Sequence, residues 1–185
     1  MIASLAGRRI DAAGAVPVRF PPALKPVVAH RIADTLHDLH VRALVCAAAC
    51  GADMLALDAA ARIGIPARIV LPYAADEFRR TSVADRGPGW GDAFDRLVSE
   101  AQARGDLRVL GLDAHDPGAF AATNEAILDE ALALAGNDLA RVVALAVWDA
   151  KTAGSAGDDH TAAFVEAARA RGIAVRAIPI VDPAL

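Results

Sequence analysis

The sequence predicts a single α/β domain over residues 1–185, with a mostly parallel sheet of about six strands flanked by helices. Short runs rich in Val, Ile and Leu alternate with longer segments of helical period, a pattern typical of a doubly wound sheet with helical crossovers. The length suits one domain, and we find no linker or internal repeat. The predicted strands are Ile2–Ala6, Ala43–Cys46, Arg68–Leu71, Leu107–Leu110, Val142–Trp148 and Ala174–Ile178.

Helices are predicted between these strands because the apolar residues there recur with helical spacing. Gly64 and Gly172 each follow such a segment, and an apolar residue then leads into the next strand. Glycine at that position indicates a helix end with positive φ. Alanine, the commonest apolar residue here, favours helix and lets helices lie close to a sheet. The predicted helices are Leu24–Leu39, Ala52–Ile63, Asp92–Arg104, Ala119–Leu134 and Thr161–Arg171.

Two segments, 11–26 and 73–91, interrupt this alternation. The first contains four prolines, and the second mixes acidic and basic residues with Gly and Pro. Loops of this length in a compact domain are usually functional or mobile. We therefore expect two long loops that serve a binding site or face a partner.

Composition and charge exclude several classes of protein. A hydrophobic fraction of 55% is too high for a disordered chain. No apolar run approaches the roughly 18 residues of a membrane span. A net charge of -4 argues against a general nucleic-acid binder. The first residues lack the basic and apolar regions of a secretory signal, so we expect a cytoplasmic protein.

Familiar catalytic and metal-binding motifs are absent from the sequence. It has no P-loop, no G-x-G-x-x-G after the first strand and no G-x-S-x-G, which disfavours nucleotide hydrolases of the P-loop type, dehydrogenases and α/β-hydrolases. The spacing of Cys46 and Cys50 fits neither a redox pair nor a zinc knuckle, so we interpret them as small buried thiols. We expect no metal site and no cofactor.

Function is expected at the carboxyl ends of the strands, where open parallel sheets bind ligands. Gly7 and Arg8 follow the first strand, while Ala48, Gly51 and Asp53 lie between the second strand and a strong helix. Small residues let the backbone approach a ligand, and the free N–H groups of a first helical turn bind anions. The alternative is an ordinary capped helix beside a tight turn.

Two further strand ends carry candidate residues. Arg79 and Arg80, in the 73–91 segment, could supply positive charge to an anionic ligand. Trp148 could stack on a base, and Asp149 could accept hydrogen bonds from a sugar or base edge. The alternative is that the Trp ring only covers the edge of the sheet.

Together these segments resemble the SLOG superfamily, a Rossmann-like group that includes LOG, DprA-type and YpsA/YspA-like proteins. The resemblance covers most of the chain. It rests on the Gly-Ala-Asp turn at 51–53, Asn124 near a helix start, the Trp-Asp pair at 148–149, and Gly157 followed by Thr161. It implies a site for a nucleotide or nucleotide-derived ligand across the carboxyl ends of the strands.

The sequence departs from the LOG pattern at one point. The glycine-rich LOG motif with its catalytic glutamate is replaced by a segment that contains Asp158 and Asp159, and the next glutamate is Glu166. Aspartates add negative charge where an anion would lie, so that end of the site would favour a neutral or cationic group.

Three functions follow as hypotheses. The first is binding of a nucleotide-like ligand by a sensor or binding protein. The second is hydrolysis of the N-glycosidic bond of nucleoside monophosphates, with Asp53, Asp149, Asp158 and Glu166 as candidate carboxylates. The third is a non-catalytic protein-interaction module, and alanine-faced helices could also form a homo-oligomer. The expected ligand-binding residues are Gly7, Arg8, Ala48, Gly51, Asp53, Arg79, Arg80, Asn124, Trp148, Asp149, Gly157 and Thr161.

Overall fold

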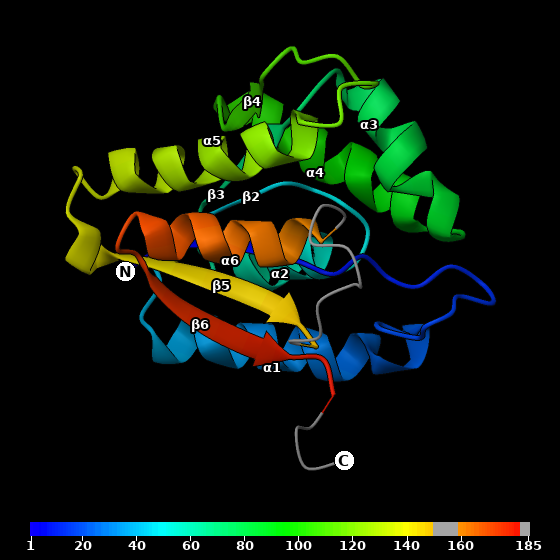
Figure 1. Cartoon of the computed structure of the whole chain (residues 1–185), viewed down its shortest axis with the longest axis horizontal. Helices are drawn as coiled ribbons and strands as arrows, with labels where there is room; N and C mark the ends of the chain where they lie inside the picture. The colour runs from blue at the N-terminus through cyan, green and yellow to red at the C-terminus, as the bar shows by residue number, and fades with distance from the viewer. Residues whose placement is uncertain (150–158, 182–185) are drawn as a thin grey trace.

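A computed structural model describes residues 1–149 and 159–181. Its strands are β1 (Ile2–Gly7), β2 (Ala43–Cys46), β3 (Ala67–Leu71), β4 (Leu107–Val109), β5 (Val142–Trp148) and β6 (Ala174–Pro179). They form one sheet in the order β4-β3-β2-β1-β5-β6, and every neighbouring pair is parallel (Figure 1). The predicted doubly wound, Rossmann-like sheet is confirmed. The strand order reverses between β1 and β5, which marks the switch point of the sheet.

Within the described residues, six helices connect the strands: α1 (Lys25–Asp38), α2 (Ala52–Arg62), α3 (Ala75–Ser82), α4 (Trp90–Arg104), α5 (Ala119–Leu134) and α6 (His160–Ala170). Short 3₁₀ turns lie at Pro22–Leu24, Ala84–Arg86 and Leu139–Arg141.

The hydrophobic core has two parts because successive strand residues point to opposite faces of the sheet. Ala3 and Leu5 of β1 pack with α1, α2 and α4, whereas Ile2 packs with α5 and α6. Figure 1 shows α1 on one side of the sheet and α5 with α6 on the other. This layering leaves the carboxyl ends of the central strands between the two helical layers.

The expectation of a continuous loop over 73–91 is wrong, because α3 occupies Ala75–Ser82. Its first turn contains acidic residues and its last turn basic ones, an order that suits the helix dipole. Phe78 and Ser82 are its buried residues. With eight residues and Phe78 as its one large apolar side chain, α3 offers too few apolar positions for the spacing from which helices are predicted.

Several smaller predictions are confirmed. Gly64 and Gly172 have φ of 73° and 75° at their helix ends. Cys46 and Cys50 are buried and unpaired, and burial raises the pKa of both thiols. Within 11–26, the Asp11 carboxylate accepts hydrogen bonds from the Arg19 and Phe20 N–H groups, which closes this loop.

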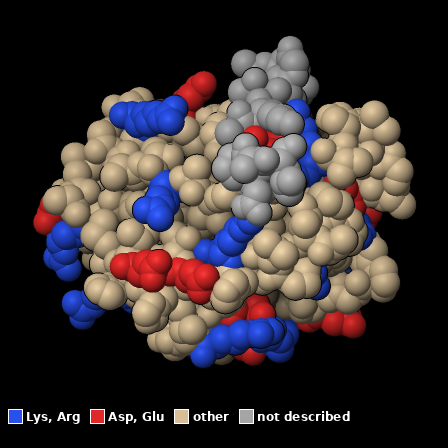
Figure 2. Space-filling model, turned by 90° about the horizontal axis from the view of Figure 1, so that it is seen from below, with Lys and Arg blue, Asp and Glu red and all other residues tan. Residues whose placement is uncertain are grey.

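Charge is evenly distributed over the surface that Figure 2 presents. Basic and acidic side chains are interspersed there, without a broad patch of either sign. Within residues 1–149 and 159–181, none of the helices has the length and apolar character needed to cross a membrane.

Candidate functional site

A pocket of about 340 Å³ lies at the carboxyl ends of β1, β2 and β3, and we call it the strand-end pocket. Gly7 lines it from β1, Ala47 and Ala49 from the turn after β2, and Tyr73 from the segment after β3. The first turns of α5 and α6 close the opposite side, where Thr123 lines the pocket from α5. This is the edge of the sheet at which the sequence predicts a ligand site.

Asp53 is the acidic member of the pocket lining. Its Oδ2 accepts a hydrogen bond from the Ala49 N–H at 3.2 Å, whereas its Oδ1 is buried and has no hydrogen-bond partner among the described residues. Burial raises the pKa of this carboxyl to about 7, although the Ala49 N–H and the Arg9 charge act in the opposite direction. Asp53 can therefore donate or accept a proton near neutral pH.

The turn before α2 brings Asp53 to this position. Gly51 has φ of 122°, and a Cβ atom there would lie 2.6 Å from the Arg8 carbonyl oxygen. The close approach allows the Ala52 N–H to donate to that carbonyl at 3.1 Å and the Ile10 N–H to donate to the Cys50 carbonyl at 3.0 Å. The turns after β1 and β2 are thus pinned together, and the Ala52 N–H is used within the protein.

Arg9 is the basic member of the lining. Its Nη2 contacts the Asp85 carboxylate and donates to Cys50 Sγ at 3.6 Å. Its Nε is buried, and no residue of 1–149 or 159–181 forms a hydrogen bond with it. The pocket therefore contains one buried donor and one buried acceptor that the described residues leave unsatisfied, Arg9 Nε and Asp53 Oδ1.

Four rings in mutual contact form what we call the aromatic wall of the pocket: Phe78, Tyr73, Phe120 and His160. Tyr73 lies 5.9 Å from Phe78 and 6.4 Å from Phe120 between ring centroids, and Phe120 lies 4.8 Å from His160. The Tyr73 hydroxyl is 3.0 Å from Thr81 Oγ1, so its polar end is hydrogen-bonded. A flat ligand could stack against such a surface.

Asn124 joins the two helices that border the pocket. Its Nδ2 donates to the His160 carbonyl oxygen at 2.9 Å, which ties α5 to the first residue of α6. The neighbouring Thr123 hydroxyl donates to the Ala119 carbonyl oxygen at 2.7 Å. Both side chains are buried and line the pocket, so they fix its shape as well as its polarity.

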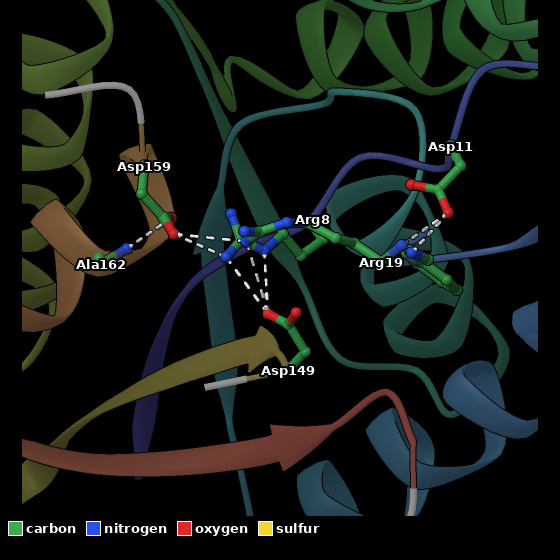
Figure 3. A network of polar contacts seen from close by, with 7 residues as sticks. Arg8, Asp11, Arg19, Asp149, Asp159 and Ala162 are labelled. Carbon is green, nitrogen blue, oxygen red and sulfur yellow. Dashed lines mark hydrogen bonds and ion pairs between the residues drawn. The ribbon is translucent and has the colours of Figure 1, made fainter. Parts of the chain in front are cut away.

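A second cluster of charged residues lies between β1 and β5, at the switch point, and we call it the Arg8 network (Figure 3). Arg8 Nη2 donates to Asp159 Oδ2 at 2.6 Å and to Asp149 Oδ1 at 3.2 Å. Arg19 Nη1 lies 3.9 Å from the same two oxygens. Asp159 also caps α6, because its Oδ1 accepts from the Ala162 N–H at 3.0 Å. Two arginines and two aspartates thus balance one another.

The predicted site residues fall into separate groups. Gly7, Asp53, Asn124 and Thr161 line the strand-end pocket together, as the sequence led us to expect. Arg8 and Asp149 instead belong to the Arg8 network. Gly157 and Asp158 lie outside the described residues, and Glu166 is exposed on α6.

The remaining predicted residues do not line the pocket. Ala48 is buried in the core, and Gly51 is the N-cap of α2. Trp148 pairs with Pro179 at the end of β5. Arg79 and Arg80 lie on α3, where they form ion pairs with Asp95 and Glu77.

Sequence reasoning missed three aromatic residues of the pocket lining, Tyr73, Phe78 and Phe120. One signal was available, because the chain has a single Tyr and five Phe, and the Tyr with two of the Phe lines the pocket. Tyr73 just after β3 and Phe120 at the start of α5 are such rare aromatic residues at the carboxyl edge of the sheet. Within the described ranges, no group of three or more His, Cys, Asp or Glu residues could hold a metal ion.

No family model and no curated protein matches this sequence. Among solved structures, the chain is similar to the X-ray structure of DNA processing protein A (DprA) from Streptococcus pneumoniae, with a TM-score of 0.55 and 18% sequence identity. The match covers 95% of this chain and 49% of that chain, so this protein spans about half the length of DprA. The resemblance expected from the sequence is therefore confirmed at the level of the fold: the chain has a Rossmann-like fold similar to that of DprA.

Proposed function

We propose that the protein binds a small nucleotide-derived ligand in the strand-end pocket and acts as a sensor or binding protein. The observation that carries this proposal is Asp53, a buried carboxyl with an unpartnered oxygen in a pocket at the carboxyl edge of a doubly wound sheet.

Unsatisfied buried polar atoms support a ligand because they cost free energy when they have no partner. Asp53 Oδ1 and Arg9 Nε are two such atoms in one pocket. A ligand with a hydrogen-bond donor and an acceptor would satisfy both, and its ring would stack on the aromatic wall. The pocket volume of about 340 Å³ is at the small end of the range of about 300–1,000 Å³ for ligand pockets.

Hydrolysis of an N-glycosidic bond is the second candidate, since a carboxyl with a pKa of about 7 suits general acid–base catalysis. Glycosidases of the usual type need two carboxylates around the scissile bond. Among the described residues, Asp53 is the single carboxylate in the pocket lining, and Asp149 is held in the Arg8 network. These observations favour binding over hydrolysis.

The test is a thermal-shift screen of bases, nucleosides and nucleotides, followed by calorimetric titration of the hits. We expect Asp53→Ala and Phe120→Ala to weaken binding at least about tenfold, which corresponds to ~1.4 kcal/mol. Asp58→Ala is the matched control, because Asp58 lies on the same helix and pairs with Arg62 at the surface.

Two results would contradict the proposal. One is a folded wild-type protein that binds no compound of the screen, and the other is equal affinity in the wild type and both pocket variants. Incubation with nucleoside monophosphates and chromatography for free base separates the two functions, because release of base by the wild type but not by Asp53→Ala would establish hydrolysis.

A further inference from the structure

One place where this fold could hold a phosphate is filled by the protein's own carboxylates. A helix N-terminus and an arginine fork are two common ways to bind an anion. Asp159 uses both at once, because one oxygen accepts from the Ala162 N–H at the start of α6 and the other from Arg8 (Figure 3). Its side chain is completely buried. Asp159 therefore lies where an anionic ligand group would make the same contacts.

Asp149 completes the arrangement from the end of β5. Its Oδ1 lies 3.2 Å from Arg8 Nη2, and Arg19 approaches both aspartates at 3.9 Å. A phosphate near Arg8 would face two carboxylates at short range, and like charges in such contact cost several kcal/mol. The Arg8 network lies beside the pocket along the chain, since Gly7, Arg9, His160 and Thr161 all line the pocket.

The charge of the pocket itself is nearly balanced. Among the described lining residues, Arg9 is the one arginine or lysine, and its guanidinium contacts Asp85. Asp53 is the one carboxylate, and burial keeps its proton attached more strongly than in water. Much of the remaining lining is apolar or aromatic. Such a surface suits an uncharged flat ring with a hydrogen-bond donor.

We propose that the strand-end pocket selects an uncharged nitrogen heterocycle, a nucleobase or its nucleoside, over the phosphorylated form of the same compound. This inference rests on the proposed function and names its ligand class. Asp53 Oδ1 forms a hydrogen bond with the ring: it accepts from a ring N–H when the carboxyl is ionised, and it donates to a ring nitrogen or carbonyl oxygen when the carboxyl is protonated. The aromatic wall stacks on the ring. Asp149 and Asp159 occupy the position on Arg8 that a phosphate would otherwise take. In this way they determine the specificity against phosphorylated ligands.

The first test compares each common base with its nucleoside and its nucleoside monophosphate by calorimetry in one buffer. We expect at least one base or nucleoside to bind, and its monophosphate to bind at least about tenfold more weakly. A monophosphate that binds as tightly as the nucleoside overturns the inference and leaves the proposed function standing. A folded protein that binds no member of any series overturns both.

The second test removes a carboxylate from the position beside Arg8 where a phosphate could bind. Asp159→Ser keeps a good N-cap for α6 but removes the carboxylate that contacts Arg8. We expect the affinity for the monophosphate, relative to the nucleoside, to rise by about tenfold. Asp138→Ser is the matched control, because Asp138 also caps a turn, at the Ala140 N–H, on an exposed surface.

An unchanged affinity ratio in a folded Asp159→Ser protein overturns the role of the Arg8 network. If this variant does not fold, Asp149→Asn gives the same measurement, since it leaves the α6 cap in place. The expected and contradicting ratios are the same for both variants.

Discussion

The strand-end pocket and the Arg8 network lie side by side at one edge of the sheet, yet they differ in whether their charged groups are paired. Arg8 and Arg9 are neighbours in sequence, but Arg8 contacts two aspartates, while the Arg9 Nε has no hydrogen-bond partner in the part of the chain that the structure describes. In the network every carboxylate meets a guanidinium, whereas in the pocket Asp53 keeps a free oxygen. The difference separates a part that holds the fold together from a part that can receive a ligand.

The physical basis of this difference is the cost of burying charge. Two buried ions are tolerated when they are paired and hydrogen-bonded. A lone buried carboxyl adapts by a raised pKa instead. The network and Asp53 are examples of these two solutions, and substitutions should affect them differently.

Among the substitutions considered, Arg8→Ala should lower the free energy of unfolding most. Arg8→Ala leaves Asp149 and Asp159 buried with weaker compensation from Arg19, so we expect the free energy of unfolding to fall by about 3–5 kcal/mol. Urea denaturation measures it. Arg62→Ala is the control, since its exposed ion pair with Asp58 should contribute about 1 kcal/mol or less. Equal losses in the two variants would mean that the network is no stronger than a surface pair.

The second prediction concerns the pH dependence of Asp53. Its ordinary pKa is 3.8 and its folded pKa is about 7, so the folded protein binds this proton more tightly than the unfolded chain. The contribution of Asp53 to the free energy of unfolding is therefore greatest below about pH 4, decreases as pH rises, and is lost above about pH 7. This decrease should amount to about 4 kcal/mol.

Asp53→Asn should abolish this decrease. Urea denaturation from about pH 5 to about pH 8 should show the variant gaining stability relative to the wild type as pH rises. Asp58→Asn, on the same helix, should follow the wild-type curve. The groups nearest to Asp53, Arg9 and the Cys46 thiol, are retained in both variants. Parallel curves for the wild type and Asp53→Asn would show that the carboxyl is ionised in the fold.

We expect a substitution on α3 to have the smallest effect on stability and on ligand affinity. Arg79 pairs with Asp95 at 2.8 Å on an exposed surface, so Arg79→Ala should leave the free energy of unfolding almost unchanged. The affinity of any pocket ligand should change by less than about twofold. A larger loss of affinity would place the α3 arginines at the ligand, as the sequence led us to expect.

The fold could be predicted because the patterns that indicate it, apolar spacing and glycines at helix ends, involve residues close together in the sequence. The bounds of the predicted strands Ala43–Cys46 and Val142–Trp148 and of the helix Ala119–Leu134 are those of the structure. Helix α3 escaped prediction, since it offers too few apolar positions. The site was predicted in part: its edge of the sheet, Asp53 and Asn124 followed from the sequence, whereas the aromatic wall did not.

The sequence by itself determined the alternation of strands and helices, the sheet edge where a ligand could bind, and a carboxylate in the first turn of α2. Only the tertiary structure decided which charged side chains meet. Arg8 contacts Asp149 and Asp159, which are 141 and 151 residues away in the chain, while Arg9 points to the pocket. Periodicity is set by neighbours a few residues apart, but an ion pair depends on distances in space that the folded sheet creates.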